Sequence, residues 1–222
     1  MDHYYKRLYE YNINNSIEND EYKNSSKKIK TNNEVINAPF GSSGDVKCVD
    51  NHIYFYCDVN IDNVYKLIEH INTINKNFKT LKSSNPYVYM EHDPIYLHIN
   101  SYGGGVYAAL TAIDVIQSSK IPIYTIVEGT AASAATIMSV VGRKRYIRPN
   151  AHMLIHQIRS WVTGKMNEIE DEYTNLTNLT KKIKNIYIKN TNLKDLDNLL
   201  SHDLWWDADK CLEVGLVDKL YN

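Results

Sequence analysis

Apolar and polar residues follow a strand and helix rhythm along most of the chain, starting near residue 52. In HIYFYCDV, the residues Ile53, Phe55 and Cys57 stand at every second position, which predicts a strand with one buried face. The next segment, NVYKLIEHINTIN, has apolar residues at helical spacing and predicts a helix. Residues 79–94, KTLKSSNPYVYMEHDP, lack either period and are expected to form a loop.

The same rhythm continues toward the C-terminus. Strands are expected at 95–100, 121–128, 144–148 and 152–157, and helices at 106–119, 134–142, 166–189 and 193–201. A last short strand should follow Gly215. This alternation predicts an α/β layered fold with right-handed crossovers. The helix at 166–189 has an apolar stripe on a charged rod, and such a stripe faces either the domain or a neighbouring subunit.

The N-terminal part of the chain has a different character. Residues 1–44 are polar and highly charged without sustained periodicity, so they are predicted to be a mobile extension, with one short helix around residues 4–11. Residues 45–222 are expected to form a single domain, because a chain of 222 residues with 43% hydrophobic content can bury one sizeable core.

Composition narrows the classes of function. The formal net charge of -1 gives no electrostatic reason to expect a nucleic acid or an anionic membrane as partner. Cys48, Cys57 and Cys211 are scattered and form no C-x-x-C pair, so we expect no metal site and a reducing compartment. No run approaches the ~20 apolar residues of a membrane span, and the first residues do not resemble a signal peptide. These features predict a soluble cytoplasmic protein.

Two loops that join a strand to a helix contain groups suited to catalysis or ligand binding. INSYGGGV contains Gly103, Gly104 and Gly105, which leave backbone N–H groups unshielded, and EGTAASAAT places Ser133 at a helix start among small residues. Ligands bind at such strand ends in open α/β sheets, and a helix start suits a developing oxyanion. By itself, a triple glycine is usually a turn and a serine among alanines is usually a helix cap. The two loops together are more indicative of a site.

A nucleophilic serine needs a base and an orienting acid. His156, in HMLIHQ, ends a predicted strand and is a candidate base, although an isolated histidine there is more often structural. His152 lies four residues earlier, but no H-E-x-x-H motif accompanies the pair. Spacing alone leaves four candidates for the acid, namely Asp203, Asp207, Asp209 and Asp218.

Four ordered motifs, INSYGGGV, GTAASAA, MLIHQ and HDLWWDADKCLEVGLVD, resemble those of the proteolytic subunit of the ATP-dependent Clp protease. The resemblance covers Ile53 to the C-terminus and implies a crotonase-like α/β fold, with the helix at 166–189 as the handle through which two seven-membered rings stack. It implies Ser133 as nucleophile, His156 as base and Asp203 as acid. The oxyanion hole would be formed by the N–H groups of Gly104 and Ala134.

The resemblance also implies a substrate and partners. Unfolded polypeptides would be cleaved inside a homo-oligomeric chamber fed by an AAA+ unfoldase, and this ATPase alone would use ATP, so no cofactor is expected. Substrate would lie along residues 159–165 as along an edge strand. The residues expected beside it are Gly103, Gly105, Gln157, Ile158 and Arg159.

Departures from the family pattern concern the loops and the docking pocket. Tyr102 replaces a proline, and HQIRSW replaces HQPxGG. In the aromatic pocket that receives the ATPase, Tyr96 matches, but His98 and Ser118 replace aromatic residues, as in divergent viral and phage relatives. A non-catalytic ring subunit and a crotonase-type acyl-CoA enzyme are the alternative functions; the complete Ser, His and Asp set favours the peptidase.

Overall fold

The computed structural model describes residues 44–84, 87 and 91–222. Its strands are β1 (Val46–Val49), β2 (His52–Phe55), β3 (Ile95–Ser101), β4 (Ile123–Ala132), β5 (Lys144–Ile147), β6 (His152–Leu154), β7 (Trp205–Trp206) and β8 (Lys219–Leu220). Its helices are α2 (Ile61–Ser84), α3 (Val106–Ser118), α4 (Ala134–Ser139), α5 (Met166–Asn190), α6 (Leu196–Leu200) and α7 (Ala208–Glu213). The α/β prediction is confirmed. The predicted extension and its short helix lie, up to residue 43, outside the described residues.

The sheet has the order β1-β2-β3-β4-β5-β8, in which β1 is antiparallel to β2 and the later pairs are parallel. Strand β4 changes its neighbour on one side. Its first half pairs with β5, and residues 130–132 pair with β6, which is in turn antiparallel to β7. Gly129, at φ 67°, stands between the two halves. The ends of β4 and β6 are thereby adjacent.

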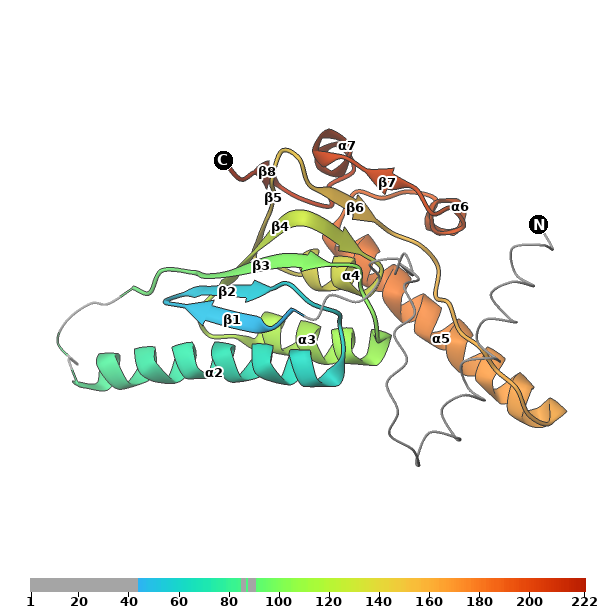
Figure 1. Ribbon diagram of the computed structural model, residues 1–222, viewed down its shortest axis with the longest axis horizontal. Coiled ribbons are helices and arrows are strands. Elements are labelled where there is room, and N and C mark those ends of the chain that lie inside the picture. Colours follow the sequence, from blue (N-terminus) through green and yellow to red (C-terminus); the bar gives the residue numbers. More distant parts are fainter. Residues whose placement is uncertain (1–43, 85–86, 88–90) are drawn as a thin grey trace, which may run out of the picture. The chain divides into compact units, whose positions relative to one another are not determined.

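Helices α2 and α3 lie along one face of the strands β1 to β4 (Figure 1). Apolar residues spaced three or four apart on α2, Val64, Leu67, Ile71 and Ile74, are buried beneath the sheet. Among the helices of the described ranges, none is both long and apolar enough to cross a bilayer.

The apolar stripe of helix α5 is buried near one end of the helix and exposed near the other. Near its C-terminal end, Ile183 and Tyr187 are buried in the core. Toward its N-terminal end, Met166, Ile169 and Tyr173 are exposed, so this part of the stripe faces solvent in the single chain.

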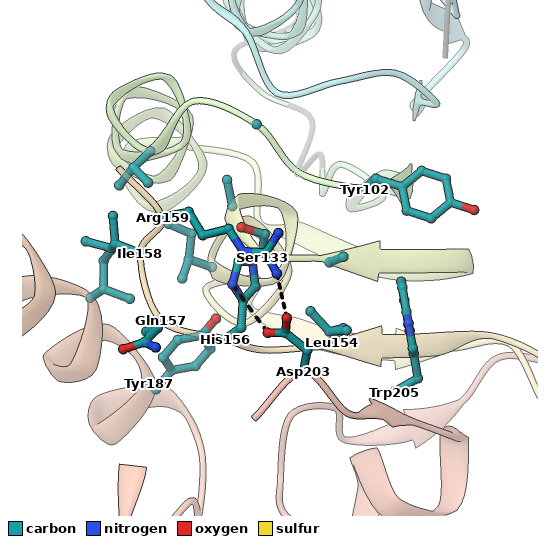
Figure 2. A pocket seen from close by; sticks show the side chains of 16 residues that line it. Tyr102, Ser133, Leu154, His156, Gln157, Ile158, Arg159, Tyr187, Asp203 and Trp205 are labelled. Carbon is teal, nitrogen blue, oxygen red and sulfur yellow. Dashed lines mark hydrogen bonds and ion pairs between the residues drawn. The ribbon is translucent and has the colours of Figure 1, made fainter. Parts of the chain in front are cut away.

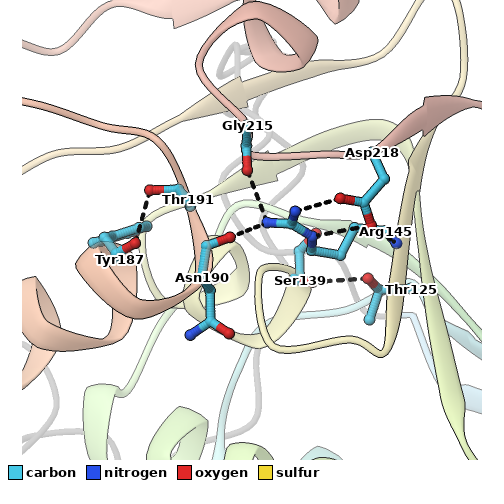
Figure 3. A network of polar contacts seen from close by, with 8 residues as sticks. All are labelled: Thr125, Ser139, Arg145, Tyr187, Asn190, Thr191, Gly215 and Asp218. Atoms are coloured by element: carbon cyan, nitrogen blue, oxygen red, sulfur yellow. Dashed lines mark hydrogen bonds and ion pairs between the residues drawn. The ribbon is translucent and has the colours of Figure 1, made fainter.

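A polar network fixes the C-terminal end of α5 to the sheet (Figure 3). The Arg145 guanidinium on β5 donates to the carbonyl oxygens of Asn190 and Gly215, the latter at 2.7 Å, and is paired with the Asp218 carboxylate. The paired arginine lowers the pKa of Asp218, although burial of the carboxyl opposes this. One arginine thus joins β5, α5 and the C-terminal segment.

Two expectations from the sequence were wrong. Residues 79–84 are not a loop but the last turns of α2, where the Ser83 and Ser84 hydroxyls donate to the carbonyl oxygens of Lys79 and Thr80. These bonds keep both serines compatible with the helix. In addition, the first strand is β1 rather than β2. The hairpin that joins them turns at Asp50 with a φ of 54°, a conformation that aspartate tolerates better than most residues.

Candidate active site

Ser133 lies at the sharp turn from β4 into α4. Its backbone has φ 53° and ψ -124°, a sparsely populated conformation for a residue other than glycine. The Ser133 N–H donates to the carbonyl oxygen of Leu154 on β6 at 2.9 Å. Gly103 packs behind the turn, where a Cβ atom would lie only 2.8 Å from the Cβ of Ser133. The small residues around Ser133 are thus needed for this tight turn.

The long helix reaches the same turn. The Ser133 carbonyl oxygen accepts from the backbone N–H of Thr136 at 3.0 Å and from its hydroxyl at 2.6 Å. That hydroxyl is also hydrogen-bonded to the hydroxyl of Tyr187, which is buried on α5. Helix α5 therefore supports, through Thr136, the turn that carries Ser133.

Gly104 is held beside the turn by a bridge to Val59. The N–H of Val59 donates to the carbonyl oxygen of Gly103 at 2.8 Å, and the N–H of Gly105 donates to the carbonyl oxygen of Val59 at 2.7 Å. These bonds leave the N–H of Gly104 itself outside the bridge. A Cβ atom on Gly104 would lie 2.4 Å from the Val59 carbonyl oxygen, and its φ of 143° also favours glycine.

A cavity of about 510 Å³ lies between the Gly104 loop, the Ser133 turn and the segment that follows β6. It is lined by Gly104, Ser133, Ala134, His156 and Asp203, which are the predicted oxyanion-hole and catalytic residues. Ala134 is the first residue of α4, a position whose N–H has no partner within a helix. The cavity therefore combines a hydroxyl, an imidazole, a carboxylate and backbone donors.

His156 follows β6 and is largely buried, with 12% of its side chain exposed. Its Nδ1 atom lies 3.8 Å from Oδ1 of Asp203, beyond hydrogen-bond distance, and has no hydrogen-bond partner among the described residues. Burial lowers the pKa of His156, the Asp203 charge raises it, and the Arg159 charge lowers it further. The imidazole is therefore mainly neutral at pH 7, the form that can accept a proton.

Of the four candidate acids, Asp203 is the one that lines the cavity. Asp207 caps α7 by accepting from the N–H of Lys210 at 2.8 Å, and Asp218 pairs with Arg145. Asp209 lies in the first turn of α7. His152 is exposed and does not line the cavity, and no group of metal-ligating side chains was found within residues 44–84, 87 and 91–222.

The residues expected beside the substrate divide into two groups. Gln157, Ile158 and Arg159 line the cavity. Gly103 and Gly105 do not, and their backbone groups pair with Val59. Residues 159–165 were expected to form an edge strand, but they have no regular structure. A ladder needs a neighbouring strand, and in the described part of the chain none pairs with this segment.

Sequence reasoning missed several residues of the site. Tyr102 and Trp205 line one end of the cavity and contact each other edge to face, with ring centroids 6.2 Å apart (Figure 2). The sequence shows that Tyr102 replaces a proline of the family pattern, but it does not reveal the contact with Trp205. Tyr187 lies four residues after Ile183, so its place on the buried stripe could have been recognised from helical spacing.

The three residues of the predicted docking pocket, Tyr96, His98 and Ser118, do not line the cavity of the candidate active site. Tyr96 and His98 are on β3, where their rings stack on those of His52 and Tyr54 respectively. Nδ1 of the buried His98 lies 3.1 Å from the Glu128 carboxylate. Ser118 is exposed at the end of α3.

The chain is similar in sequence to known proteins over most of its length. The sequence model described as Clp protease matches residues 69–222, which include every cavity residue discussed above. The chain is also 36% identical over 131 residues to the ATP-dependent Clp protease proteolytic subunit 2 of Treponema denticola. That match covers 57% of this chain and 66% of the relative. Because the family match spans most of the chain, from the middle of α2 to the last residue, the protein belongs to the Clp protease family.

Proposed function

We propose that this protein is a serine endopeptidase in which Ser133 is the nucleophile, His156 the general base and Asp203 the orienting acid. The observation that carries the proposal is the single cavity lined by all three side chains, which come from the ends of β4 and β6 and from the segment before β7. Membership in the Clp protease family supports the same reaction.

The reaction would be acyl transfer. His156 removes the proton of the Ser133 hydroxyl as its oxygen attacks a peptide carbonyl carbon, and the N–H groups of Gly104 and Ala134 stabilise the resulting oxyanion. The protonated His156 then gives its proton to the leaving amine. Water, deprotonated by His156, then attacks the acyl carbon; the ester bond to Ser133 breaks, and His156 returns the proton to the serine oxygen. The chemistry uses the chain's own groups and requires no cofactor.

The substrates we propose are unfolded polypeptides. The segment after His156 has no regular structure and lines the cavity through Gln157, Ile158 and Arg159, so a peptide could lie along its main chain. Main-chain contacts of this kind select an extended conformation more than a particular sequence.

We also propose that the chain assembles into stacked heptameric rings that enclose the active sites. The exposed apolar residues Met166, Ile169 and Tyr173 on α5 support an interface between copies, because exposed apolar stripes mark contact surfaces. An AAA+ unfoldase would feed the chamber and consume ATP, in the cytoplasm. The docking pocket that the resemblance implies on this chain matches the family pattern at Tyr96 and departs from it at His98 and Ser118, so these residues do not support docking of the family's usual unfoldase loop.

A non-catalytic ring subunit is the second candidate. The long distance between His156 and Asp203, 3.8 Å, favours it, since a working triad holds this pair in a hydrogen bond.

One experiment separates the two candidates. The assembled wild-type protein and its Ser133→Ala variant are treated with a serine-reactive fluorophosphonate, and labelling is followed by mass spectrometry. The peptidase proposal predicts labelling of wild type on Ser133 and none of the variant. Assembled wild-type rings that are never labelled would favour the non-catalytic subunit. Mass photometry checks that both proteins assemble alike.

A further inference from the structure

The Asp203 carboxylate lies close to both the Arg159 guanidinium and the His156 imidazole, but it contacts the guanidinium more closely. Its Oδ2 atom accepts from Nη2 of Arg159 at 2.5 Å, while its Oδ1 atom remains 3.8 Å from Nδ1 of His156 (Figure 2). The first contact is a short charge-assisted hydrogen bond, and the second is no hydrogen bond at all. Arg159 therefore holds the carboxylate that His156 needs.

The two contacts differ in the environment of their partners. Arg159 has 77% of its side chain exposed and Asp203 has 54%, and ion pairs between such exposed groups contribute little to stability. His156 Nδ1, in contrast, is buried and has no hydrogen-bond partner within the described part of the chain, which is costly. Loss of the Arg159 contact therefore costs little, whereas a hydrogen bond between His156 and Asp203 would satisfy a buried nitrogen.

The position of Arg159 allows a bound substrate to compete with Asp203 for its guanidinium. It lines the cavity three residues after His156, on the segment beside which a peptide would lie. A bound peptide brings carbonyl oxygens, and in acidic sequences carboxylates, that accept hydrogen bonds from a guanidinium. These acceptors compete with Asp203 for the same donor.

We propose that Arg159 is a positioning residue that withholds Asp203 from His156 in the empty site and releases it when a peptide carrying an acidic side chain binds. This inference rests on the proposed peptidase function. After release, Asp203 accepts from the Nδ1–H of His156, which fixes the tautomer whose Nε2 accepts the proton of Ser133. The site would therefore act faster on peptides with an acidic residue near the scissile bond.

The first test measures the resting site. Full-length wild type, Arg159→Gln, Arg159→Lys and the control Lys194→Gln are compared by their rates of inactivation by a fluorophosphonate between pH 5 and 9. Lys194 is a suitable control because it is an exposed cation that lies outside the proposed substrate segment and does not line the cavity. Arg159→Gln should react severalfold faster. Its acidic limb should move to higher pH, because removal of the cation and approach of Asp203 both raise the pKa of His156. Arg159→Lys and Lys194→Gln should stay close to wild type.

The second test measures the effect of substrate. Two peptides that differ only by Glu or Gln beside the scissile bond are hydrolysed by the same proteins. Wild type should have a severalfold higher kcat on the Glu peptide, and Arg159→Gln should lose this preference. Equal inactivation rates and pH profiles for wild type and Arg159→Gln overturn the inference alone. Absence of labelling in every variant, wild type included, overturns the peptidase proposal and the inference together.

Discussion

The hydroxyl of Tyr187, near the end of α5, is hydrogen-bonded to the hydroxyl of Thr136 in α4. Thr136 in turn donates to the carbonyl oxygen of Ser133, so the long helix supports the strained turn that carries Ser133. Because α5 also has an exposed apolar segment, this contact links the proposed subunit interface with the proposed nucleophile.

The Tyr187→Phe variant should keep its fold and lose activity. It removes the hydroxyl that fixes Thr136, at a cost of about 0.5 to 1.5 kcal/mol in stability, the usual net value of one hydrogen bond. We expect the fluorophosphonate labelling rate to fall by up to about tenfold, as the Ser133 turn becomes less well positioned. Tyr65→Phe, an exposed position on α2 outside the proposed interface, is the matched control. Unchanged labelling of Tyr187→Phe would show that the support is dispensable.

Gly104→Ala should inactivate the protein. The added Cβ would collide with the Val59 carbonyl oxygen and force the Gly104 N–H to move. Loss of one oxyanion donor costs about 2.7 to 4 kcal/mol of the barrier, so kcat should fall by about 10² to 10³. Gly105→Ala is the control, because Gly105 has an ordinary φ of -67° and its Cβ would meet no atom closer than 3.5 Å. Equal losses in both variants would argue against a specific role for Gly104.

Asp203→Asn should lose most peptidase activity, whereas Asp207→Asn should retain it. Asp203 is the carboxylate beside His156, and its replacement by an amide removes the charge that stabilises the imidazolium. Asp207 caps α7 instead, and asparagine is also a good N-cap residue, so stability should change by only a few tenths of a kcal/mol. Peptide hydrolysis and thermal unfolding of both variants distinguish these roles. The reverse pattern of activity would mean that the acid has been misassigned.

The acidic limb of the kcat/KM profile should lie below the ordinary histidine pKa of 6.5. Burial lowers the pKa of His156 more than Asp203 raises it, and only the neutral imidazole can act as base. Activity should therefore persist as pH falls toward 6.5 and decline at lower pH, when His156 becomes protonated. Hydrolysis of a peptide without acidic residues, measured from pH 4.5 to 8, checks this. A midpoint above 6.5 would contradict it.

Much of the fold was predictable because its strands and helices carry clear periods of buried residues, as Ile53 and Phe55 do on β2. The loop at 79–84 was wrong because Ser83 and Ser84, which usually favour turns, bond back to the helix carbonyls. β1 was missed because its short run has only one fully buried residue, Val46.

The proposed triad and oxyanion residues were predicted from motifs that are local in sequence, and Asp203, Gly104 and Ala134 were assigned only through the resemblance that these motifs carry. Their arrangement was not predictable in the same way. The pairing of Arg159 with Asp203 joins residues 44 positions apart and depends on side-chain direction, which no local pattern encodes. The contact between Tyr187 and Thr136 likewise joins two helices that are far apart in sequence.

The change of neighbour along β4 has a mechanical consequence. On one side, β3 accompanies β4 as far as Ala131; on the other, β5 is replaced by β6 after the Gly129 bend. The proposed base therefore follows a three-residue strand, while the proposed nucleophile follows a ten-residue one. Loosening of β6 and β7 would disturb the spacing of His156 and Ser133 before it opened the pairing of β2, β3 and β4, so we expect activity to be lost at a lower temperature than the fold.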